Sequence, residues 1–206
     1  LLGRESIVIN NVQVSKDINK KVVCITGAAG SIGSELARQV LAYEPSVLIL
    51  IDQAESPLYE IEYELRSGKH FTRILVFVAD IANKDRMNYI FQECKPEIVF
   101  HAAAYKHVPM MESNPSEAVT TNIFGTKILA DVSVAMGVKR FVMVSTDKAV
   151  NPTNVMGCTK RIAEIYVQAL NFHLKNTGKE TTAFVTTRFG NVLGSNGSVI
   201  PVFKKQ

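Results

Sequence analysis

Thr26-Gly27-Ala28-Ala29-Gly30-Ser31-Ile32-Gly33 follows an apolar, strand-like run directly and opens a helix-like segment. Its glycines have the spacing GxxGxxG. Gly27 and Gly30 allow a tight turn that brings backbone N–H groups close to a pyrophosphate, and Gly33 lets the helix pack against a sheet. The helix start at Ser31-Ile32 adds a favourable dipole for an anion. Glycines also serve ordinary turns, but a strand before and a helix after them predict a dinucleotide-binding loop.

Around this loop, short β-branched runs alternate with amphipathic segments. The runs are continuously apolar, which is typical of parallel strands covered by helices on both faces. Six such strands with helical crossovers predict an α/β fold with a doubly wound parallel sheet, a Rossmann arrangement of order 3-2-1-4-5-6. The expected strands are Lys21–Thr26, Ser46–Asp52, Arg73–Val78, Glu97–His101, Arg140–Ser145 and Thr182–Arg188. The expected helices are Ser31–Tyr43, Ser56–Ser67, Lys84–Cys94, Pro115–Gly137 and Val155–Thr177.

The bulk composition describes an ordinary globular domain. The chain has 206 residues, 47% of them hydrophobic and 20% charged, with a net charge of +4. Lys and Arg are scattered, without a basic run or interleaved aromatics, so we expect no nucleic-acid partner. Cys24, Cys94 and Cys158 lack metal-binding spacing and suit a reducing cytosol, so no metal is expected. No signal peptide or apolar run of about 18 residues is present, so we expect this chain to make no membrane contact.

The two ends of the chain differ from its middle. Residues 1–20 carry polar side chains without a clear period, and we interpret them as a lead-in segment or linker. Residues 21–206 are expected to form a dinucleotide-binding domain with the start of a substrate-binding part. Ser198–Gln206 begins a helix-like stretch that stops without a cap, as expected for a piece of a longer protein.

Three further segments are candidates for cofactor contacts. Asp52 closes the second strand, where an acidic side chain bonds ribose hydroxyls and repels a 2′-phosphate; this predicts NAD, with NADP disfavoured. The alternative for Asp52 is a helix N-cap. Asp80-Ile81 ends the third strand and is placed to reach adenine, although a plain turn Asp is a rival interpretation. Ala102-Ala103-Ala104 ends the fourth strand and would let the cofactor lie against the backbone, while small residues also suit tight packing.

Three longer segments carry specific motifs: Ser145–Arg161 (STDKAVNPTNVMGCTKR), Ala104–Pro109 (AYKHVP) and Arg188–Val192 (RFGNV). They resemble the extended short-chain dehydrogenase/reductase superfamily. Within it, they resemble the UDP-N-acetylglucosamine 4,6-dehydratases of bacterial polysaccharide synthesis, in particular the membrane-anchored, CapD-like branch. The resemblance covers nearly the whole chain, and its Thr-Asp-Lys segment is quite specific.

This resemblance implies a location and partners as well as a reaction. It implies NAD as cofactor, a UDP-amino sugar as substrate with UDP-GlcNAc as the expected one, and a 4-keto-6-deoxy product. It also implies a homo-oligomer in which helices 115–137 and 155–177 pair between subunits. The domain would lie on the cytoplasmic side, with the full-length protein anchored in the bacterial inner membrane.

Thr146, Asp147 and Lys148 carry the expected chemistry. They follow the fifth strand, at the sheet edge where open α/β sheets place ligands. An acid beside a base suits an elimination. By resemblance, Lys148 removes the C5 proton of the sugar, Asp147 protonates the departing C6 hydroxyl, and Thr146 bonds the C4 oxygen. The tripeptide alone would otherwise be interpreted as a charged turn.

Met156 departs from the superfamily pattern Tyr-x-x-x-Lys. Lys160 is in place, but its partner four residues earlier is a thioether without an exchangeable proton, so Met156 is neither acid nor base. By resemblance the anchored branch also carries Met here. The base for the C4 hydroxyl stays open between Asp147 and a water ordered by Thr146, and loss of activity is the alternative. The resemblance implies that Lys160 holds the nicotinamide ribose and helps keep Asp147 ionised.

Five residues are candidates for substrate contacts. Lys106 and His107 follow the fourth strand and are expected to meet sugar or phosphate, although a lone His is more often structural. Asn122 matches the superfamily's Asn in the fourth helix, with a surface helix Asn as the alternative. Arg188 and Asn191 resemble nucleotide-sugar contacts of the family.

Three functions remain in competition at this point. The leading hypothesis is NAD-dependent 4,6-dehydration of a UDP-N-acetylhexosamine. A 4-epimerase of the same fold needs only C4 oxidation and reduction, and the pair Asp147-Lys148 favours elimination because an epimerase removes no C5 proton. The third is a non-catalytic NAD-binding module. Because a further C-terminal lobe closes over the sugar in the family, we expect this chain to bind NAD but to turn over poorly.

Overall fold

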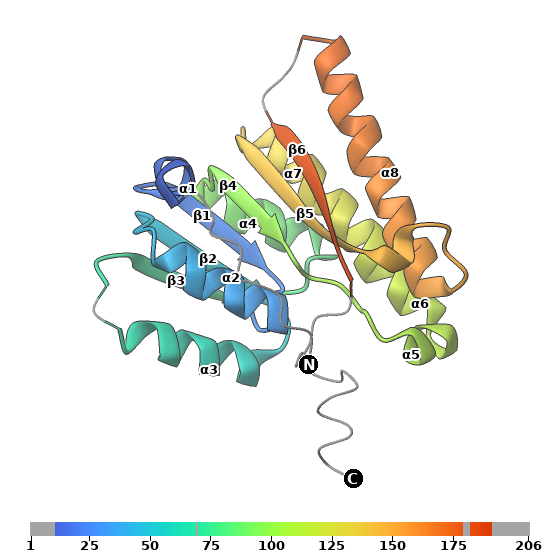
Figure 1. Cartoon of the computed structure of the whole chain (residues 1–206), viewed down its shortest axis with the longest axis horizontal. Coiled ribbons are helices and arrows are strands. Elements are labelled where there is room, and N and C mark those ends of the chain that lie inside the picture. The colour runs from blue at the N-terminus through green and yellow to red at the C-terminus, as the bar shows by residue number, and fades with distance from the viewer. Residues whose placement is uncertain (1–10, 69, 179–181, 191–206) are drawn as a thin grey trace.

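A six-stranded parallel sheet of order β3-β2-β1-β4-β5-β6 lies at the centre of the structure (Figure 1). The computed structural model describes residues 11–68, 70–178 and 182–190. The predicted strand order is confirmed, and every strand end lies within one residue of its expected position. The strands are β1 (Val22–Thr26), β2 (Val47–Asp52), β3 (Arg73–Val78), β4 (Ile98–His101), β5 (Arg140–Thr146) and β6 (Ala183–Phe189).

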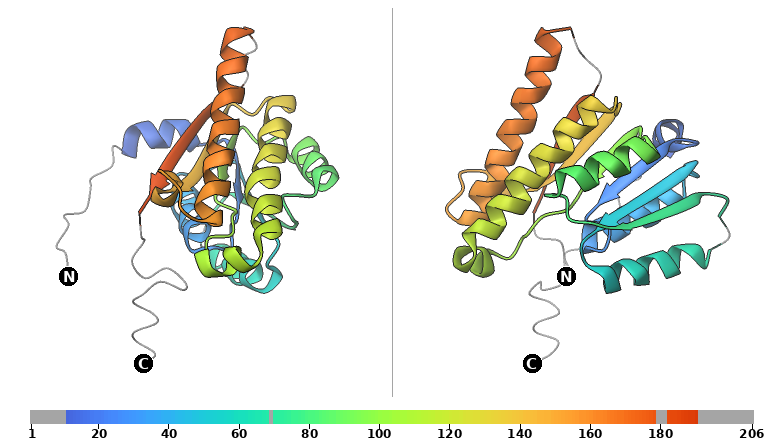
Figure 2. Two further views of the ribbon diagram at one scale, coloured as in Figure 1. Left: turned by 90° about the vertical axis from the view of Figure 1, so that its right-hand side faces the viewer. Right: turned by 180° about the vertical axis from the view of Figure 1, so that it is seen from behind.

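Helices cover both faces of the sheet, as the side and back views in Figure 2 show. One face packs against α1 (Asn11–Ile18), α2 (Ser31–Leu41) and α3 (Glu55–Arg66). The other packs against α4 (Lys84–Cys94), α7 (Thr126–Ala135) and α8 (Val155–Asn176). The remaining helical segments are α5 (Val108–Ser113), α6 (Pro115–Ala118), a π-helix η1 (Val119–Gly125) and a 3-10 turn η2 (Asp147–Ala149).

The two helical layers explain why the strands are apolar throughout. Along β2, Leu48 and Leu50 pack toward α2 and α3, whereas Ile49 and Ile51 pack toward α4 and α7. All four side chains are fully buried. A strand with both faces in a core has no position for a polar side chain until its end, so polar residues gather at the strand ends.

The first helix has no counterpart in the sequence prediction. Residues 11–18 form α1, whose Ile18 packs into the cluster under α2 and α3, and Asp17 pairs with Arg140 of β5 at 2.8 Å. Eight residues span little more than two turns, which is too short for an apolar period to be recognised. Whether residues 1–20 also link to another domain stays a prediction.

Pro115–Gly137, predicted as one helix, is divided into α6, η1 and α7. The π-helix lies where the chain passes the end of β3. A Cβ placed on Gly125 would lie 2.7 Å from Cδ1 of Ile81, so this glycine permits the close approach. Single π-turns inside helices often occur at functional sites, and this one contains Asn122.

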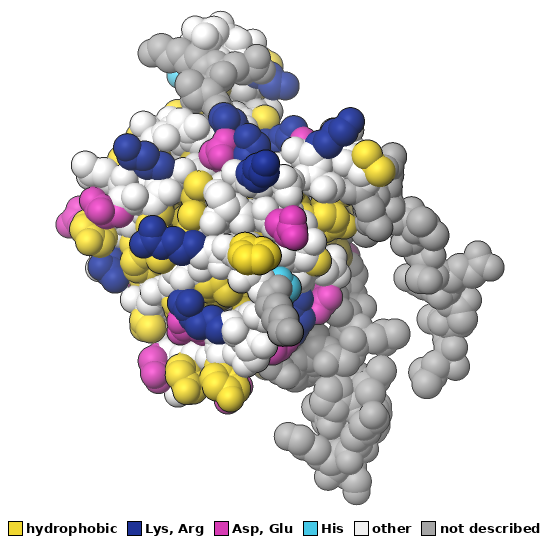
Figure 3. All heavy atoms as spheres, turned by 90° about the vertical axis from the view of Figure 1, so that its left-hand side faces the viewer, with side chains coloured by type: hydrophobic (Ala, Val, Ile, Leu, Met, Phe, Trp, Pro, Cys, Tyr) yellow, Lys and Arg dark blue, Asp and Glu magenta, His cyan; other side chains and the backbone are white. Residues whose placement is uncertain are grey.

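Among the described residues, charged side chains of both signs lie close together on the surface next to α3 and β3 (Figure 3). In Figure 3, Lys and Arg side chains are interspersed with Asp and Glu, and hydrophobic side chains lie between them. Within the described residues, no helix combines the length and apolar character needed to span a bilayer.

Candidate dinucleotide and catalytic site

A pocket of about 240 Å³ opens at the carboxyl ends of the first four strands. Eight residues predicted to bind the cofactor line it: Gly27, Gly30, Asp52, Asp80, Ile81, Ala102, Ala103 and Ala104. Seven residues that were not singled out complete the lining: Ala29, Gln53, Ala54, Pro57, Ala79, Tyr105 and Thr121. Ser31, Ile32 and Gly33 lie in the first turn of α2, next to this lining rather than in it.

The glycine loop is held against the end of β4 by contacts that only glycine permits. A Cβ on Gly27 would lie 2.4 Å from the backbone nitrogen of Ala103, and the φ of Gly27 is +70°. A Cβ on Gly33 would lie 2.0 Å from the Gly27 carbonyl oxygen. Gly30 is the N-cap of α2 and offers no side chain to cap it, so the helix presents first-turn N–H groups to an anion. These features fit the pyrophosphate of a dinucleotide.

Asp52 connects this loop to the neighbouring helix. Its Oδ2 accepts a hydrogen bond from the Ala29 N–H at 3.0 Å, and its Oδ1 accepts one from the Ala54 N–H at 2.9 Å. The N-cap position of α3 belongs to Ala54, not to Asp52. Each carboxylate oxygen accepts more than one hydrogen bond, so Asp52 can still receive ribose hydroxyls. Asp80 accepts a hydrogen bond from the Ala82 N–H at 2.8 Å, as expected for a turn residue, and it also lines the pocket.

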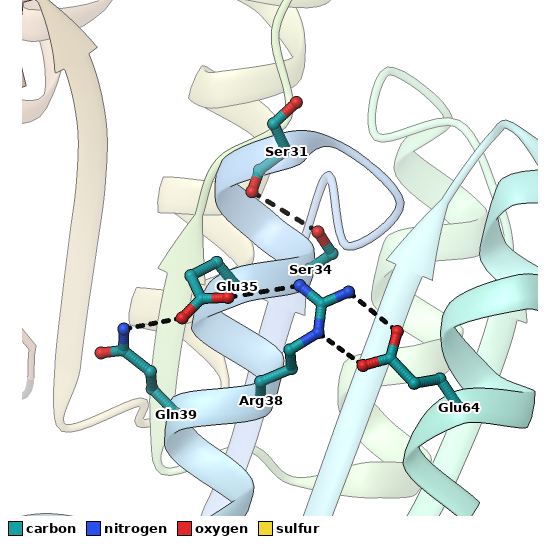
Figure 4. Close-up of polar contacts among 6 residues, drawn as sticks. All are labelled: Ser31, Ser34, Glu35, Arg38, Gln39 and Glu64. Carbon is teal, nitrogen blue, oxygen red and sulfur yellow. Dashed lines mark hydrogen bonds and ion pairs between the residues drawn. The ribbon is translucent and has the colours of Figure 1, made fainter. Parts of the chain in front are cut away.

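An ion pair on the surface holds α2 beside α3. Figure 4 shows the Arg38 guanidinium donating to both oxygens of Glu64, at 2.6 and 2.8 Å, and to Glu35 of its own helix. The hydrogen bond from Arg38 lowers the pKa of Glu64. Because both side chains are about half exposed, the pair orients the helices that flank the pocket more than it stabilises the fold.

His101, the last residue of β4, is fully buried between two threonines. Its Nδ1 lies 2.8 Å from Thr26 Oγ1, and its Nε2 lies 2.8 Å from Thr126 Oγ1. Thr126 already donates its hydroxyl proton to the Asn122 carbonyl at 2.7 Å, so it has to accept from Nε2. His101 therefore carries its proton on Nε2, and its Nδ1 accepts a hydrogen bond from the Thr26 hydroxyl. Burial lowers the pKa of His101 to about 3, so the ring is neutral.

Asn122 is bonded to two other parts of the protein, and its contact with substrate stays a prediction. Its side chain is fully buried, so it is not a surface residue. Oδ1 accepts from the Tyr105 N–H at 2.9 Å, while Nδ2 donates to the Tyr105 carbonyl at 3.1 Å and to Thr159 Oγ1 at 3.0 Å. Both amide protons are therefore used within the protein. Asn122 fixes the loop after β4 to α8.

Thr146, Asp147 and Lys148 meet where β5 runs into η2. Asp147 Oδ1 accepts from the Thr146 hydroxyl at 2.9 Å and from Lys148 Nζ at 3.1 Å. These two hydrogen bonds, led by that of Thr146, lower the pKa of Asp147 below its usual value near 3.8. Asp147 is ionised at neutral pH, and its side chain is 55% exposed. Thr146 and Lys148 hold it ionised, whereas the resemblance assigned that help to Lys160.

Lys160 and Met156 lie on the buried side of α8. Lys160 Nζ donates to the Val144 carbonyl at 2.8 Å, and burial, opposed by the charge of Glu164, lowers its pKa to about 8. Met156 is 3% exposed and packs with Met111 and Ala118. The thioether fills an apolar gap one turn before the lysine, where the superfamily pattern has a phenol.

Glu164 is a residue of the site that the sequence prediction missed. Its carboxylate is fully buried and accepts hydrogen bonds from Nε and Nη2 of Arg188, at 2.9 and 2.7 Å. It also accepts one from Arg161 Nη1 at 3.1 Å. Burial opposes ionisation, but the hydrogen bonds, led by that of Arg188, lower the pKa of Glu164 to about 2. The spacing Met156, Lys160, Glu164 on an otherwise apolar helix face was the available signal.

The other predicted substrate residues are less constrained. Arg188 turns one edge of its guanidinium to Glu164 and remains 40% exposed. Lys106 and His107 are exposed in the loop between β4 and α5, with His107 at the N-cap of α5. Asn191 lies outside the described residues.

Comparison with known proteins places this geometry in a family. The model of the family described as polysaccharide biosynthesis protein matches residues 23–206. The chain belongs to this family. In the polysaccharide biosynthesis family, the capsular polysaccharide biosynthesis protein CapD of Staphylococcus aureus is 49% identical over all of this chain and 34% of its own length. A UDP-N-acetylglucosamine 4,6-dehydratase (inverting) of Campylobacter jejuni is 38% identical over 91% of this chain and 54% of its own.

More distant relatives and solved structures extend the likeness. A UDP-glucose 4-epimerase of Rickettsia bellii is 32% identical over 90% of this chain and 53% of its own length. The X-ray structure of Pen from Bacillus thuringiensis superposes with a TM-score of 0.85 and 38% identity, covering 92% of this chain and 56% of that one. This chain therefore spans between a third and somewhat over half of these proteins.

Proposed function

We propose that the whole protein is an NAD-dependent enzyme that converts a UDP-N-acetylhexosamine, with UDP-GlcNAc as the expected substrate, into a 4-keto-6-deoxy sugar. The observation that carries this proposal is the ionised Asp147 held between Thr146 and Lys148 at the end of β5. β5 pairs with β4, whose end lines the dinucleotide pocket. The 38% identical dehydratase relative supports the same reaction.

Bound NAD would accept hydrogen from C4 of the sugar as hydride and later return it to C6. An ionised Asp147 suits the first proton transfer, because it can accept the C4 hydroxyl proton that Met156 cannot. The same carboxyl then donates that proton to the C6 oxygen, which departs as water. In its ion pair with Asp147, Lys148 is an ammonium, so it has to lose one proton to solvent before it can act as a base. The neutral amine then takes the C5 proton before this departure and returns a proton to C5 afterwards. The net change is the loss of one water, and both residues end in their starting states.

The deciding experiment follows C5 of the sugar. Full-length protein with UDP-GlcNAc and NAD in deuterated water should give a 4-keto-6-deoxy product with deuterium at C5, detected by NMR. Lys148→Ala should lower the rate of product formation and of C5 exchange by about 10²- to 10⁴-fold. Lys127→Ala, which removes a surface lysine of α7, is the matched control and should leave both rates unchanged.

Two other outcomes would replace the proposal. Formation of UDP-GalNAc without deuterium at C5 would establish the 4-epimerase, a function that the Rickettsia relative also carries by name. Unchanged sugar in a protein that binds NAD would favour a non-catalytic module or a different sugar as the substrate. Assembly through α7 and α8 and membrane anchoring of the full-length protein stay predictions.

A further inference from the structure

A hydrogen bond crosses the mouth of the dinucleotide pocket. Gln53 follows β2 and Tyr105 follows β4, and Gln53 Nε2 donates to the Tyr105 hydroxyl at 3.1 Å. In the sheet, β1 lies between β2 and β4. The bond therefore passes over the end of β1, where the glycine loop begins, and both residues line the pocket.

Both ends of this bridge are attached to a backbone that is itself held in place. The Tyr105 N–H and carbonyl are both bonded to the Asn122 side chain, and the Tyr105 side chain packs against the cluster of Met111, Ala118 and Met156. Gln53 follows Asp52, which is bonded to Ala29 and Ala54. The bridging bond itself is exposed to solvent. Such a bond opens easily, whereas the bonds from Asn122 to Tyr105 and from Asp52 to Ala29 are partly buried.

We propose that Tyr105 and Gln53 form a clasp over the cofactor pocket, which has to open whenever the dinucleotide enters or leaves. The proposal rests on the proposed function for the identity of the dinucleotide. The proposed reaction also gives a reason for retaining the dinucleotide. In a dehydration that oxidises C4 and reduces C6 of the same sugar, one cofactor molecule serves both steps, so its release between them would leave the sugar oxidised. A dehydrogenase that exchanges its cofactor every turnover has no such need.

The kinetic signature of a clasp differs from that of a direct cofactor contact. Loss of a direct contact raises the dissociation rate constant and Kd together and leaves the association rate constant unchanged. A clasp that is closed both with and without bound dinucleotide raises the energy barrier for entry and for exit. Its loss therefore lowers both barriers. Association and dissociation then become faster together, and Kd changes by less than either rate constant.

Tyr105→Phe removes the hydroxyl and keeps both the ring and the backbone bonds to Asn122. Stopped-flow mixing of full-length protein with NAD, and displacement of bound NAD by excess ADP-ribose, give the two rate constants without any sugar. We expect both to rise about three- to tenfold, which corresponds to loss of one ordinary hydrogen bond. Gln53→Leu should give the same increase, and the double variant no further one. Tyr59→Phe, which changes an exposed tyrosine of α3, is the control.

Two results would overturn the clasp. One is unchanged rate constants in Tyr105→Phe and Gln53→Leu. The other is a rise in Kd that matches the rise in dissociation alone, which would make these side chains cofactor contacts. Because no sugar is present, either result stands apart from the test of dehydration: an epimerase or a non-catalytic module would still show whether the clasp exists.

Discussion

The two halves of the sheet build their parts of the site by different means. From β1 to β4, the site is shaped by backbone: Gly27 against Ala103, and the Asp52 carboxylate on two backbone N–H groups. From β5 to α8, it is shaped by charged side chains, with Lys160 and Glu164 buried and Asp147 at the surface. The β1 to β4 part, here the cofactor half, is therefore set by steric fit. The β5 to α8 part, which we propose carries the catalysis and call the catalytic half, is set by the balance between burial and ion pairing.

This contrast extends to the buried polar groups of each half. His101, in the cofactor half, is neutral and bonded only to hydroxyl groups. Glu164, in the catalytic half, is ionised and bonded to two arginines. Acid should therefore destabilise the two halves in different pH ranges.

The largest expected effect is the acid sensitivity that His101 causes. Its pKa is near 3 in the folded protein and near 6.5 in the unfolded chain, so the unfolded chain binds the extra proton first. The contribution of His101 to stability is fully present above pH 6.5 and is lost as pH falls toward 3, by up to about 1.4 kcal/mol per pH unit and on the order of 5 kcal/mol in all. His101→Gln should remove this slope in urea unfolding at pH 7.5 to 4.5, although it lowers stability at neutral pH.

Two further variants sharpen this result. His173→Gln, which changes an exposed histidine of α8, should keep the wild-type slope. Glu164 has a folded pKa near 2 against a usual value near 4.5, so its contribution is present above pH 4.5 and lost below it. Glu164→Gln should flatten the dependence of the free energy of unfolding on pH only below pH 4.5. A wild-type slope between pH 6.5 and 5 in His101→Gln would contradict a neutral, buried imidazole.

The same contrast explains what the sequence predicted well. Strand positions followed from continuous apolar runs, because burial on both faces allows no polar residue until the strand ends. The glycine loop was recognisable because each glycine meets a steric limit that another residue violates. These are local constraints, and a single sequence displays them directly.

The parts that escaped prediction depend on distant partners. The sequence left Asn122 open between a match to the superfamily's Asn and a helix-surface residue, and only the π-turn shows that its amide bonds Tyr105 and Thr159. In the sequence, Glu164 looks like an ordinary solvated charge, and only the fold shows that Arg188 of β6 lies against it. The sequence around each residue does not indicate a partner that lies 17 or more positions away, except for the helical spacing of Glu164 from Lys160.

A smaller effect tests the steric basis of the cofactor half. Gly27 and Gly137 both have a φ of +70°, but a Cβ on Gly137 would meet nothing within 4 Å. Gly137→Ala should therefore cost only the backbone strain, about 1 kcal/mol. Gly27→Ala adds a clash with the Ala103 backbone and should cost about 3 kcal/mol more in urea unfolding, with loss of NAD binding. Equal costs for the two variants would show that the loop adjusts and that the steric argument is wrong.

The smallest expected effect concerns the choice between NAD and NADP. Asp52→Asn keeps a side-chain oxygen for one of the two backbone N–H groups that Asp52 now holds, so the loop should stay in place. It removes the negative charge that would repel a 2′-phosphate. The ratio of the Kd for NADP to the Kd for NAD, measured by titration calorimetry, should fall about tenfold, or 1.4 kcal/mol.

Asp80→Asn is the matched control for this change, because Asp80 lines the same pocket and also accepts a backbone hydrogen bond. It should leave the ratio unchanged, since we expect the 2′-hydroxyl at the end of β2 and not at the end of β3. An equal shift in both variants would mean that the pocket discriminates by its overall charge. A shift in Asp80→Asn alone would reverse the assignment of ribose and adenine to the ends of the two strands.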